Sequence, residues 1–269
     1  MNIAILGANG RMGGALLTTV EKDTETNIGA ACVRDSSPLV DTPLISVFPT
    51  ATSDSARNMT LSTIADVDES MDVVIDFTLP EALERHLAVC QEKQLPMVIG
   101  TTGLNEQQLA ALSDAAKHIP IVFAANYSVG VTLMTTLCRI ATRVLSDSAD
   151  IEIIEAHHRF KRDAPSGTAL AIGQAIAEEA NRSLETDAIY GREGDTGERQ
   201  HNTIGFSTIR GGDIIGEHTA LFADIGERVE ITHKASSRET FAVGAVRAAK
   251  WLNGKPAGLY SMNDVLGLV

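Results

Sequence analysis

The sequence has few cysteines: Cys32, Cys90 and Cys138 are the three in 269 residues, and no two of them form a CxxC pair. Neither a disulfide framework nor a zinc site fits this spacing, so we expect buried, reduced thiols and no bound metal. The chain also lacks any apolar run near the roughly 20 residues that a membrane-spanning helix needs. Its start, MNIAILG, has no basic flank typical of a signal peptide. We therefore expect a cytoplasmic protein with no membrane partner.

Basic residues are in short supply as well. The chain has 22 Lys and Arg against 35 Asp and Glu, which gives a formal net charge of -13. Nucleic acids and anionic membranes select proteins with a dominant basic face, so neither is expected as the main partner. Hydrophobic residues make up 44% of the chain, enough to bury the core of one large domain or two modest ones. A globular protein that binds a small anion at a locally positive site fits this composition.

Short apolar runs alternate with helical patterns in the first half of the chain. The apolar runs predict strands at residues 2–6, 27–33, 72–77, 96–100 and 119–124. The segments with apolar residues at helical spacing predict helices at residues 14–22, 80–93 and 105–117. Strands that alternate with helices indicate a parallel, doubly wound sheet covered on both faces. We expect an α/β fold with an N-terminal Rossmann-like domain.

The pattern changes after about residue 128. Helices are predicted at residues 131–145 and 169–180, with strands at 151–156, 203–209 and 229–233. The turn signals Gly211-Gly212-Asp213 and Asp224-Ile225-Gly226 favour hairpins. We expect an α+β domain with a mixed or antiparallel sheet at residues 129–238, and a last helix at 240–252 that returns to the first domain. The first domain then comprises residues 1–128 and 239–269.

Three glycines follow the first predicted strand. Gly7, Gly10 and Gly13 form GxxGxxG, in which Asn9 takes the place of the second glycine of the commoner GxGxxG. Between a strand and a helix, such a turn lets the backbone approach a pyrophosphate at the helix N-terminus. We favour dinucleotide binding here over an ordinary tight turn.

The end of the second predicted strand bears on the choice of cofactor. An acid there would pair with the ribose hydroxyls of NAD, but the sequence reads Val33-Arg34-Asp35. Arg34 offers a guanidinium to a 2′-phosphate, so we predict that NADPH is preferred or at least well accepted, although Asp35 is near enough in sequence to reach a ribose. The alternative is a solvated surface arginine. Two further strand ends, at 100–103 and 124–127, are expected to flank the nicotinamide half of the cofactor, although ordinary turns look similar.

The segment from Glu155 to Ala169 reads EAHHRFKRDAPSGTA and places five basic side chains in six positions. The following Pro165-Ser166-Gly167-Thr168 is typical of a helix entry, whose unpaired amides and dipole suit a carboxylate or phosphate. Imidazole and ammonium groups beside an anion-binding turn indicate proton transfer to a bound acid. We therefore expect the substrate to bind at this segment.

The chain resembles the 4-hydroxy-tetrahydrodipicolinate reductase (dihydrodipicolinate reductase) family of bacterial lysine and diaminopimelate biosynthesis over essentially its whole length. The motifs that carry the resemblance are GANGRMG at 7–13, DVVIDFT at 72–78, VIGTTG at 98–103, FAANYSVG at 123–130 and IEIIEAHHRFKRDAPSGTA at 151–169. The last of these is the most specific. The segment at 204–238, IGFSTIRGGDIIGEHTALFADIGERVEITHKASSR, adds to it.

The resemblance implies a nicotinamide-dependent oxidoreductase that reduces a cyclic dicarboxylate to tetrahydrodipicolinate. It implies a dinucleotide-binding domain at 1–128 and 239–269, a substrate-binding and oligomerisation domain at 129–238, and a homotetramer. By position, His157 and Lys161 match the proton-donating pair, and His158, Gly167 and Thr168 match the substrate-carboxylate contacts. The positions that match cofactor contacts are Gly7, Ala8, Asn9, Gly10, Arg11, Met12, Arg34, Gly100, Thr101, Thr102, Ala124, Ala125, Asn126 and Tyr127. Many members carry Glu where this chain has Val33, so strong use of NADH is not expected and NADPH is favoured.

Alternatives stay open at the residue level. Adjacent His157 and His158 on an extended segment point to opposite sides, which disfavours a shared metal site and leaves a structural role for either one. Arg159 and Arg162 also fit a solvated basic face. Which member of the His157/Lys161 pair donates the proton is not decided by the sequence.

Two other functions compete with the reductase. One is a different nicotinamide-dependent oxidoreductase acting on a small amino or dicarboxylic acid; an acylating dehydrogenase is disfavoured because no cysteine lies near the fourth or fifth strand end. The other is a redox sensor that binds dinucleotide without catalysis. The sensor leaves the histidine and lysine cluster unexplained and requires a DNA-binding element that the sequence lacks.

Overall fold

The computed structural model describes residues 1–268. The chain divides into two compact units, and each is described here by itself. The first unit contains Met1–Val129 and the chain from Arg238 onward, and the second contains Gly130–Ser237. Within residues 1–268, no helix is long and apolar enough to cross a membrane.

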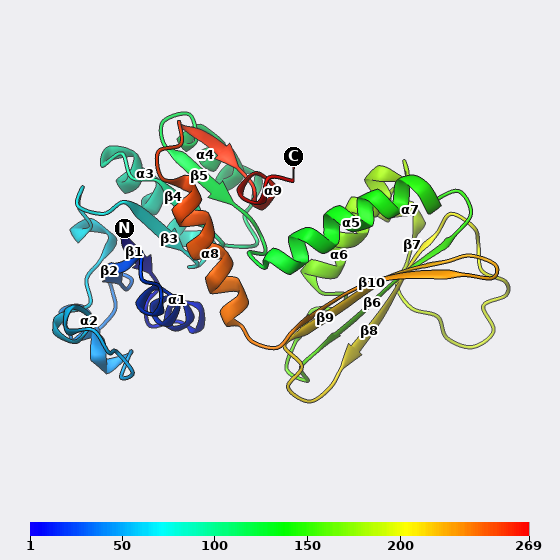
Figure 1. Ribbon diagram of the computed structural model, residues 1–269, viewed down its shortest axis with the longest axis horizontal. Coiled ribbons are helices and arrows are strands. Elements are labelled where there is room, and N and C mark those ends of the chain that lie inside the picture. Colours follow the sequence, from blue (N-terminus) through cyan, green and yellow to red (C-terminus); the bar gives the residue numbers. More distant parts are fainter. Residues whose placement is uncertain (269) are drawn as a thin grey trace. The chain divides into compact units, whose positions relative to one another are not determined.

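The first unit is built on a parallel sheet of six strands (Figure 1). The strands are β1 (Asn2–Leu6), β2 (Asn27–Cys32), β3 (Val73–Asp76), β4 (Met97–Ile99), β5 (Pro120–Phe123) and β11 (Gly258–Tyr260). They lie in the order β11-β5-β4-β3-β1-β2, and every pairing is parallel. The order reverses between β1 and β3, and the carboxyl ends on either side of such a switch point form the usual binding edge of these sheets. The predicted Rossmann-like sheet is confirmed.

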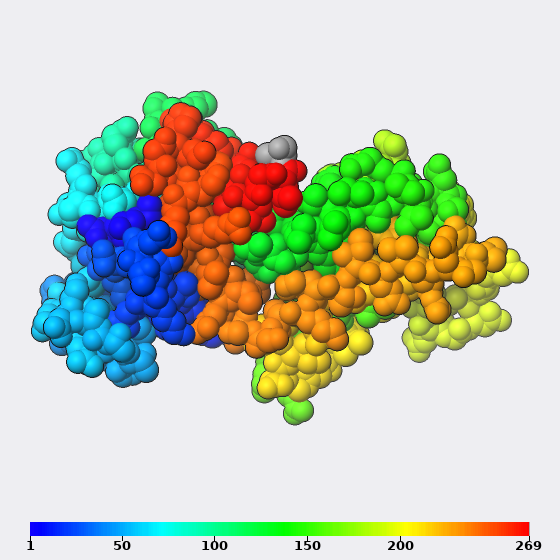
Figure 2. Space-filling view, viewed as in Figure 1, coloured from blue at the N-terminus to red at the C-terminus, as the bar shows by residue number. Residues whose placement is uncertain are grey.

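Helices cover both faces of this sheet. The longer ones are α1 (Arg11–Lys22), α3 (Leu83–Glu92), α4 (Glu106–Ala115) and α8 (Glu239–Leu252). The short ones are η1 (Leu44–Ser46), α2 (Asp54–Asn58), η2 (Ile64–Asp66), η3 (Pro80–Ala82) and α9 (Met262–Leu266). Alternate residues of β1 explain the layers, since Ile3 and Ile5 join the core under α1 and α8, whereas Ala4 and Leu6 join the core under α3 and α4. Figure 2 shows α8, in orange, alongside α1, in blue, on the surface of this unit.

The second unit is a five-stranded mixed sheet with α5 (Val129–Leu145) and α6 (Gly167–Glu179) on one face (Figure 1). The remaining elements are β6 (Asp150–His157), α7 (Leu184–Asp187), β7 (Ala188–Ile189), β8 (Ile204–Arg210), β9 (Gly216–Ala223) and β10 (Arg228–Ala235). The strand order is β10-β9-β6-β8-β7. Because β6 pairs with β8 in parallel and with β9 antiparallel, the predicted mixed sheet is confirmed.

One of the two predicted hairpins is wrong. The turn at Asp224-Ile225-Gly226 does connect the hydrogen-bonded neighbours β9 and β10. The turn at Gly211-Gly212-Asp213 connects β8 to β9, but β6 lies between those two strands in the sheet. The parallel pairing of β6 with β8 fills the position that a hairpin partner would take. A turn signal specifies a change of direction and not which strand the chain pairs with afterwards.

Helix α6 packs closely on one face of the sheet, which is therefore the inward face of the sheet. A Cβ atom on Gly173 would lie 2.5 Å from the ring of Phe206, so the helix lies directly on β8. Ile151 and Ile153 of β6 and Phe222 of β9 are buried in the same core. Strand residues of the same parity, further along, therefore point toward the side that α6 covers.

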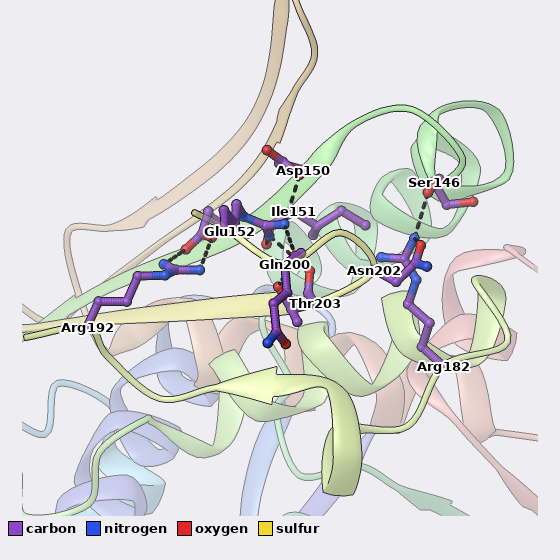
Figure 3. A network of polar contacts seen from close by, with 10 residues as sticks. Ser146, Asp150, Ile151, Glu152, Arg182, Arg192, Gln200, Asn202 and Thr203 are labelled. Atoms are coloured by element: carbon purple, nitrogen blue, oxygen red, sulfur yellow. Dashed lines mark hydrogen bonds and ion pairs between the residues drawn. The ribbon is translucent and has the colours of Figure 1, made fainter. Parts of the chain in front are cut away.

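Arginines fix the long connection between β7 and β8 to the sheet (Figure 3). Arg192 donates to both carboxylate oxygens of Glu152, at 3.1 and 2.9 Å. Arg199 donates to Glu152 at 3.2 Å and to Asp150 at 2.8 Å. The Glu152 carboxylate in turn lies over Gly205, where a Cβ atom would be 1.9 Å from Oε2. These contacts hold a segment with little regular structure in one place.

The three cysteines are all buried and free. Burial raises the pKa of Cys32 to about 11 and that of Cys138 to about 12. Such thiols stay protonated at neutral pH and are poor nucleophiles. The prediction of buried, reduced thiols is confirmed.

Candidate active site

The glycine turn is the best-defined feature at the binding edge of the first unit. Gly7 has a φ of +72°, in the left-handed region that favours glycine, and a side chain on Gly13 would collide with the turn. Gly10 is the N-cap of α1, and neither a side-chain cap nor an acidic residue occupies the first turn of this helix. The amides of Arg11 and Met12 thus lie at the positive end of the helix dipole with room for an anion.

The neighbouring residues tie this turn to the adjacent strands. Ala8 is buried, and its amide donates to the carbonyl oxygen of Cys32 at the end of β2, at 2.9 Å. The methyl group of Thr78, after β3, lies near Gly7, since a Cβ atom there would be 3.1 Å away. Asn9 is exposed. The turn is therefore held from both sides while Asn9 and the first turn of α1 stay accessible.

The ends of β4 and β5 meet at the same edge. Gly100 is required there because a Cβ atom would lie 2.2 Å from the ring of Phe77. Phe77 in turn contacts Tyr127, with ring centroids 5.2 Å apart. Thr101 is 1% exposed, and its Oγ1 atom has no hydrogen-bond partner within residues 1–268. A buried hydroxyl with an unused donor and acceptor is costly unless a ligand satisfies it, so Thr101 fits a polar contact to a cofactor.

Five other predicted cofactor residues follow β4 and β5, with different exposures. Thr102 and Ala125 are exposed, and Ala124 and Asn126 are half-buried. Tyr127 is 1% exposed, and its hydroxyl donates toward the carbonyl oxygens of Ile99 and Val122, each 2.9 Å away. The phenol of Tyr127 is thus committed to the protein, and only its backbone remains to face a ligand.

Arg34, at the end of β2, lies next to an ion pair. Val33 is buried, Arg34 is exposed, and the Asp35 carboxylate pairs with the guanidinium of Arg85 from α3. Arg85 neutralises the carboxylate that would otherwise repel a phosphate or accept from ribose hydroxyls. This strand end therefore has one acid, which is paired with Arg85, and an exposed arginine beside it in the sequence.

A buried acid lies at the end of β3. Asp76 is fully buried; one carboxylate oxygen accepts from the amide and hydroxyl of Thr78, at 2.9 and 2.6 Å. The other oxygen lies 2.7 Å from Nδ1 of His86 on α3. Because Thr78 lies against Gly7, these bonds brace the glycine turn from below. The glycine turn, the open helix terminus and the orphaned Thr101 hydroxyl together fit a dinucleotide.

The candidate acid–base residues of the second unit lie on the inward face of the sheet. His157 and Glu155 are the last inward residues of β6, and their register partners on β8 are Arg210 and Thr208. His218 lies opposite Glu155 on β9. All five residues have the parity of the core-facing positions, so their side chains gather where α6 begins.

Glu155 is the centre of this group. It is 1% exposed, and its Oε2 atom lies 2.6 Å from Nδ1 of His157. Arg210 donates to both carboxylate oxygens, at 2.8 and 2.9 Å. Oε1 also accepts from the amide of Ser166, at 3.0 Å, and from the hydroxyl of Thr208, at 3.3 Å. Burial raises the pKa of Glu155, but the hydrogen bonds from Arg210, His157 and Ser166 together lower it by more. The pKa of Glu155 therefore lies below its usual value. Glu155 is therefore a carboxylate at neutral pH.

His157 and His218 are neighbouring buried imidazoles. Their ring centroids lie 5.2 Å apart, edge to face. Burial lowers the pKa of His157, although Glu155 opposes this, and the charges of Lys161 and Arg210 lower it too. The pKa of His218 falls to about 4, first through burial and then through His157. The Nε2 atom of His218 shares a hydrogen bond of 3.1 Å with the hydroxyl of Ser166.

The remaining predicted substrate residues lie on the loop after β6 and on the first turn of α6. Lys161 is half-buried, with Nζ 2.9 Å from a carboxylate oxygen of Asp163, and its charge acts on His157. His158 is half-buried, and Nδ1 has no hydrogen-bond partner within the described residues. Gly167 and Thr168 open α6, whose N-cap Ser166 accepts from the amide of Ala169. The first turn contains no acid, so it suits a carboxylate.

Sequence reasoning missed the residues beneath His157. Glu155 and His218 contact its ring, Arg210 binds the Glu155 carboxylate, and none of the three was singled out. Ser166 was expected as part of the helix entry, but not as a partner of Glu155 and His218. One signal was present: Glu155 has the inward parity of Ile151 and Ile153, and an acid in an apolar strand two residues before a histidine suggests a buried pair. Arg210 and His218 come close to His157 only because β8 and β9 pair with β6. No group of three or more His, Cys, Asp and Glu side chains between residues 1 and 268 is arranged to hold a metal ion.

The Rossmann-like unit with its anion-binding turn, and the buried acid–base group of the other unit, define a nicotinamide-dependent oxidoreductase. Residues 1–127 match the family model for dihydrodipicolinate reductase, N-terminus, and residues 130–266 match the model for dihydrodipicolinate reductase, C-terminus. The chain belongs to the dihydrodipicolinate reductase family.

Individual relatives agree with this assignment. The 4-hydroxy-tetrahydrodipicolinate reductases of Pseudoalteromonas atlantica and Pseudomonas fluorescens are 59% and 54% identical to this chain, each over 99% of it and 98% of the relative. The solved structure of a dipicolinate-bound dihydrodipicolinate reductase from Paenisporosarcina sp. TG-14 has the same fold. Its TM-score is 0.75, at 24% identity over 97% of both chains.

Proposed function

We propose that this protein reduces 4-hydroxy-tetrahydrodipicolinate to tetrahydrodipicolinate in lysine and diaminopimelate biosynthesis. The observation that carries the proposal is the buried Glu155–His157 pair, 2.6 Å apart, next to Lys161 and the acid-free first turn of α6. Such a site combines a proton donor with a place for carboxylates. The similarity over 99% of the chain to reductases with this name supports the choice of substrate.

The residues proposed to hold the dinucleotide are those at the carboxyl ends of the first unit's strands. The amides of Asn9, Arg11 and Met12 take the pyrophosphate, because those of Ala8 and Gly10 already donate to backbone carbonyl oxygens. The segments at 100–102 and 124–127 lie along the nicotinamide half. When bound, the reduced nicotinamide supplies the hydride. The buried hydroxyl of Thr101 is the polar group that we assign to the nicotinamide side.

The proposed proton comes from the His157/Lys161 pair. Glu155 accepts the Nδ1 proton of His157, which leaves Nε2 as the atom that faces the substrate. Lys161 adds a positive charge that stabilises negative charge developing on the substrate, and each of the two groups is able to transfer a proton. The amides of Gly167 and Thr168 and the ring of His158 take the substrate carboxylates.

We propose that NADPH is favoured over NADH. Arg34 is exposed at the end of β2, Val33 is apolar, and Asp35 is neutralised by Arg85. A 2′-phosphate therefore meets guanidinium groups, and a free ribose hydroxyl meets no unpaired carboxylate at this strand end. Charge-assisted bonds from arginine to phosphate are among the stronger contacts available to a protein.

We also propose a homotetramer, assembled through the sheet of the second unit. The face of this sheet opposite α5 and α6 carries exposed apolar side chains, among them Ile154 and Ile209. Contact between copies would bury them. Light scattering coupled to size-exclusion chromatography tests this directly, and a monomer at micromolar concentration contradicts it.

The function is tested by following the oxidation of NADPH and NADH by the purified protein. The substrate is made in the cuvette by a synthase that condenses pyruvate with aspartate semialdehyde, and the same mixture without the synthase is the control. We expect rapid oxidation that depends on the synthase and is faster at low NADPH than at low NADH. Intact dinucleotide binding with no such oxidation would overturn the substrate assignment and favour another oxidoreductase.

A further inference from the structure

The charged groups around His157 come from every element packed against it. On its own strand, Glu155 bonds Nδ1 at 2.6 Å. Arg210 of β8 bonds the same carboxylate, and His218 of β9 lies against the imidazole ring. The loop after β6 contributes Lys161, whose partner Asp163 is 2.9 Å away. Gly216 of β9 lies beside the ring, since a Cβ atom there would be 3.1 Å from Nε2.

Burial of the ring outweighs the attraction of Glu155, so the pKa of His157 is lowered. The Glu155 carboxylate favours a charged imidazole, but Arg210 binds both of its oxygens and offsets its charge. Burial and Lys161 both disfavour a second positive charge in the same place. In the free protein, the balance leaves His157 neutral, with its proton on Nδ1 and directed to Glu155.

A dianionic ligand changes this balance. Two carboxylates bound at the first turn of α6 and at Lys161 bring negative charge close to the ring and take up the positive charge of Lys161. The positive charge of Lys161 then no longer opposes protonation of His157, while the hydrogen bond to Glu155 still favours it.

We propose that Glu155 is a positioning residue that keeps the proton of neutral His157 on Nδ1, so that Nε2 takes up a proton from solvent when the dicarboxylate binds. This inference rests on the proposed function. In the subsequent reaction the Nε2–H bond breaks, the proton goes to the substrate, and His157 returns to the neutral Nδ1–H form. Glu155 remains a carboxylate throughout, and no other co-reactant is needed for the proton step.

The proton balance can be measured without turnover. The probe is dipicolinate, an aromatic dicarboxylate that nicotinamides do not reduce, titrated calorimetrically into the protein with and without saturating NADPH. Repeating the titration at pH 7 in buffers of different ionisation enthalpy gives the number of protons exchanged. We expect uptake of about one proton per dipicolinate bound, because the two bound carboxylates favour the imidazolium form of His157. Binding without proton uptake in the wild type would overturn the proposal.

Two variants identify the group that takes up the proton. His157→Gln should bind dipicolinate with almost no uptake, whereas uptake that persists in it would place the proton elsewhere and reject the assignment. Arg210 donates to both oxygens of Glu155 and so does not discriminate between them. In Glu155→Gln, the further donors Ser166 and Thr208 therefore select the amide oxygen at the Oε1 position. The amide NH₂ group then faces Nδ1 of His157, so the neutral ring must carry its proton on Nε2.

The imidazole nitrogen shifts of His157, measured by NMR on the free proteins, are therefore expected to exchange between wild type and Glu155→Gln. A merely structural role of Glu155 would not reverse the tautomer. An unchanged tautomer in a folded Glu155→Gln variant contradicts the proposal. These readouts do not involve turnover. A wild type that takes up the proton but does not oxidise NADPH with the substrate would refute the proposed function and leave the role of Glu155 standing.

Discussion

A Cβ atom on Gly13 would lie 2.1 Å from the carbonyl oxygen of Gly7. Helix α1 therefore rests directly on the turn that precedes it, and the amides of its first turn reach the edge of the sheet. The adjacent Gly14 differs completely, because a Cβ atom there would have no heavy atom within 4 Å. Two neighbouring glycines of one helix thus have opposite packing demands.

We expect Gly13→Ala to weaken dinucleotide binding at least tenfold and to destabilise the first unit by about 1–3 kcal/mol, because the helix must move off the turn. Gly14→Ala is the matched control and should gain up to about 1 kcal/mol from helix propensity. Dinucleotide titrations by fluorescence and urea unfolding of both variants test this. Equal dinucleotide affinity in the two variants would show that the turn does not bind the pyrophosphate.

Substitution of either member of the His157/Lys161 pair is expected to reduce turnover and leave the protein folded. Removal of a general acid typically costs about 10²–10⁴ in rate, and we expect His157→Gln and Lys161→Ala each to fall in this range in kcat. Arg162→Ala removes an exposed basic residue of the same loop and should keep nearly normal turnover. Steady-state assays with circular dichroism on all three variants give the comparison. Near-normal kcat in both His157→Gln and Lys161→Ala would reject the proposed proton donors.

The sequence was sufficient for the fold where apolar residues are consecutive or periodic. The apolar residues of β1 and β3 are buried between helices on both faces of the sheet. A strand that is buried on both faces requires consecutive apolar residues, which the sequence shows directly. The strand β11 reads Gly-Leu-Tyr and so has no apolar run, unlike β4 of the same length, and it exists because it pairs with β5. The wrong hairpin at 211–213 has a similar cause. Strand order depends on which faces can be buried together, and local turn chemistry does not encode that.

In the candidate site, too, the residues close together in sequence were predicted, and those brought in by strand pairing were not. His157 and Lys161 stand out because basic residues crowd one short segment of an acidic chain. Arg210 and His218 reach His157 through the register of β8 and β9, 53 and 61 positions further along the sequence. No sequence pattern links residues at such separations. Arg85 likewise meets Asp35 only because α3 packs beside the end of β2.

The Asp35–Arg85 pair predicts the cofactor preference. Arg34→Ala should raise the Michaelis constant for NADPH about tenfold and leave that for NADH almost unchanged, since a charge-assisted bond is worth about 1.5–3 kcal/mol. Arg85→Gln should also weaken NADPH and improve NADH, because the uncovered Asp35 carboxylate repels phosphate and accepts from ribose. Arg34 is exposed and the Arg85 side chain is 52% exposed, so neither substitution should disturb the fold.

Binding of 2′,5′-ADP and 5′-AMP to the same variants, measured by calorimetry, separates the phosphate contact from catalysis. We expect the ratio of the two affinities to fall in Arg34→Ala and in Arg85→Gln. A constant ratio in both would remove these arginines from the 2′-phosphate site.

His218 predicts how stability depends on pH. Its pKa is about 4 in the folded protein against an ordinary value of 6.5. Between these values the unfolded chain binds a proton at this position and the folded chain does not. Stability is therefore complete above about pH 6.5 and is lost as the pH falls toward 4. The difference between the two pKa values corresponds to a loss of roughly 3 kcal/mol in the free energy of unfolding once the pH is below both.

Replacing this histidine should make the free energy of unfolding less sensitive to acid. His218→Gln keeps a side-chain amide that can bond the hydroxyl of Ser166, but it has no titrating group. We expect wild type to lose more stability than the variant between pH 7 and pH 4.5, by about 2–3 kcal/mol, in urea unfolding followed by circular dichroism. Because His157 also has a lowered pKa, some acid sensitivity should remain in the variant. Identical slopes against pH would mean that His218 accepts its proton in the folded state, and the buried, neutral imidazole described above would be wrong.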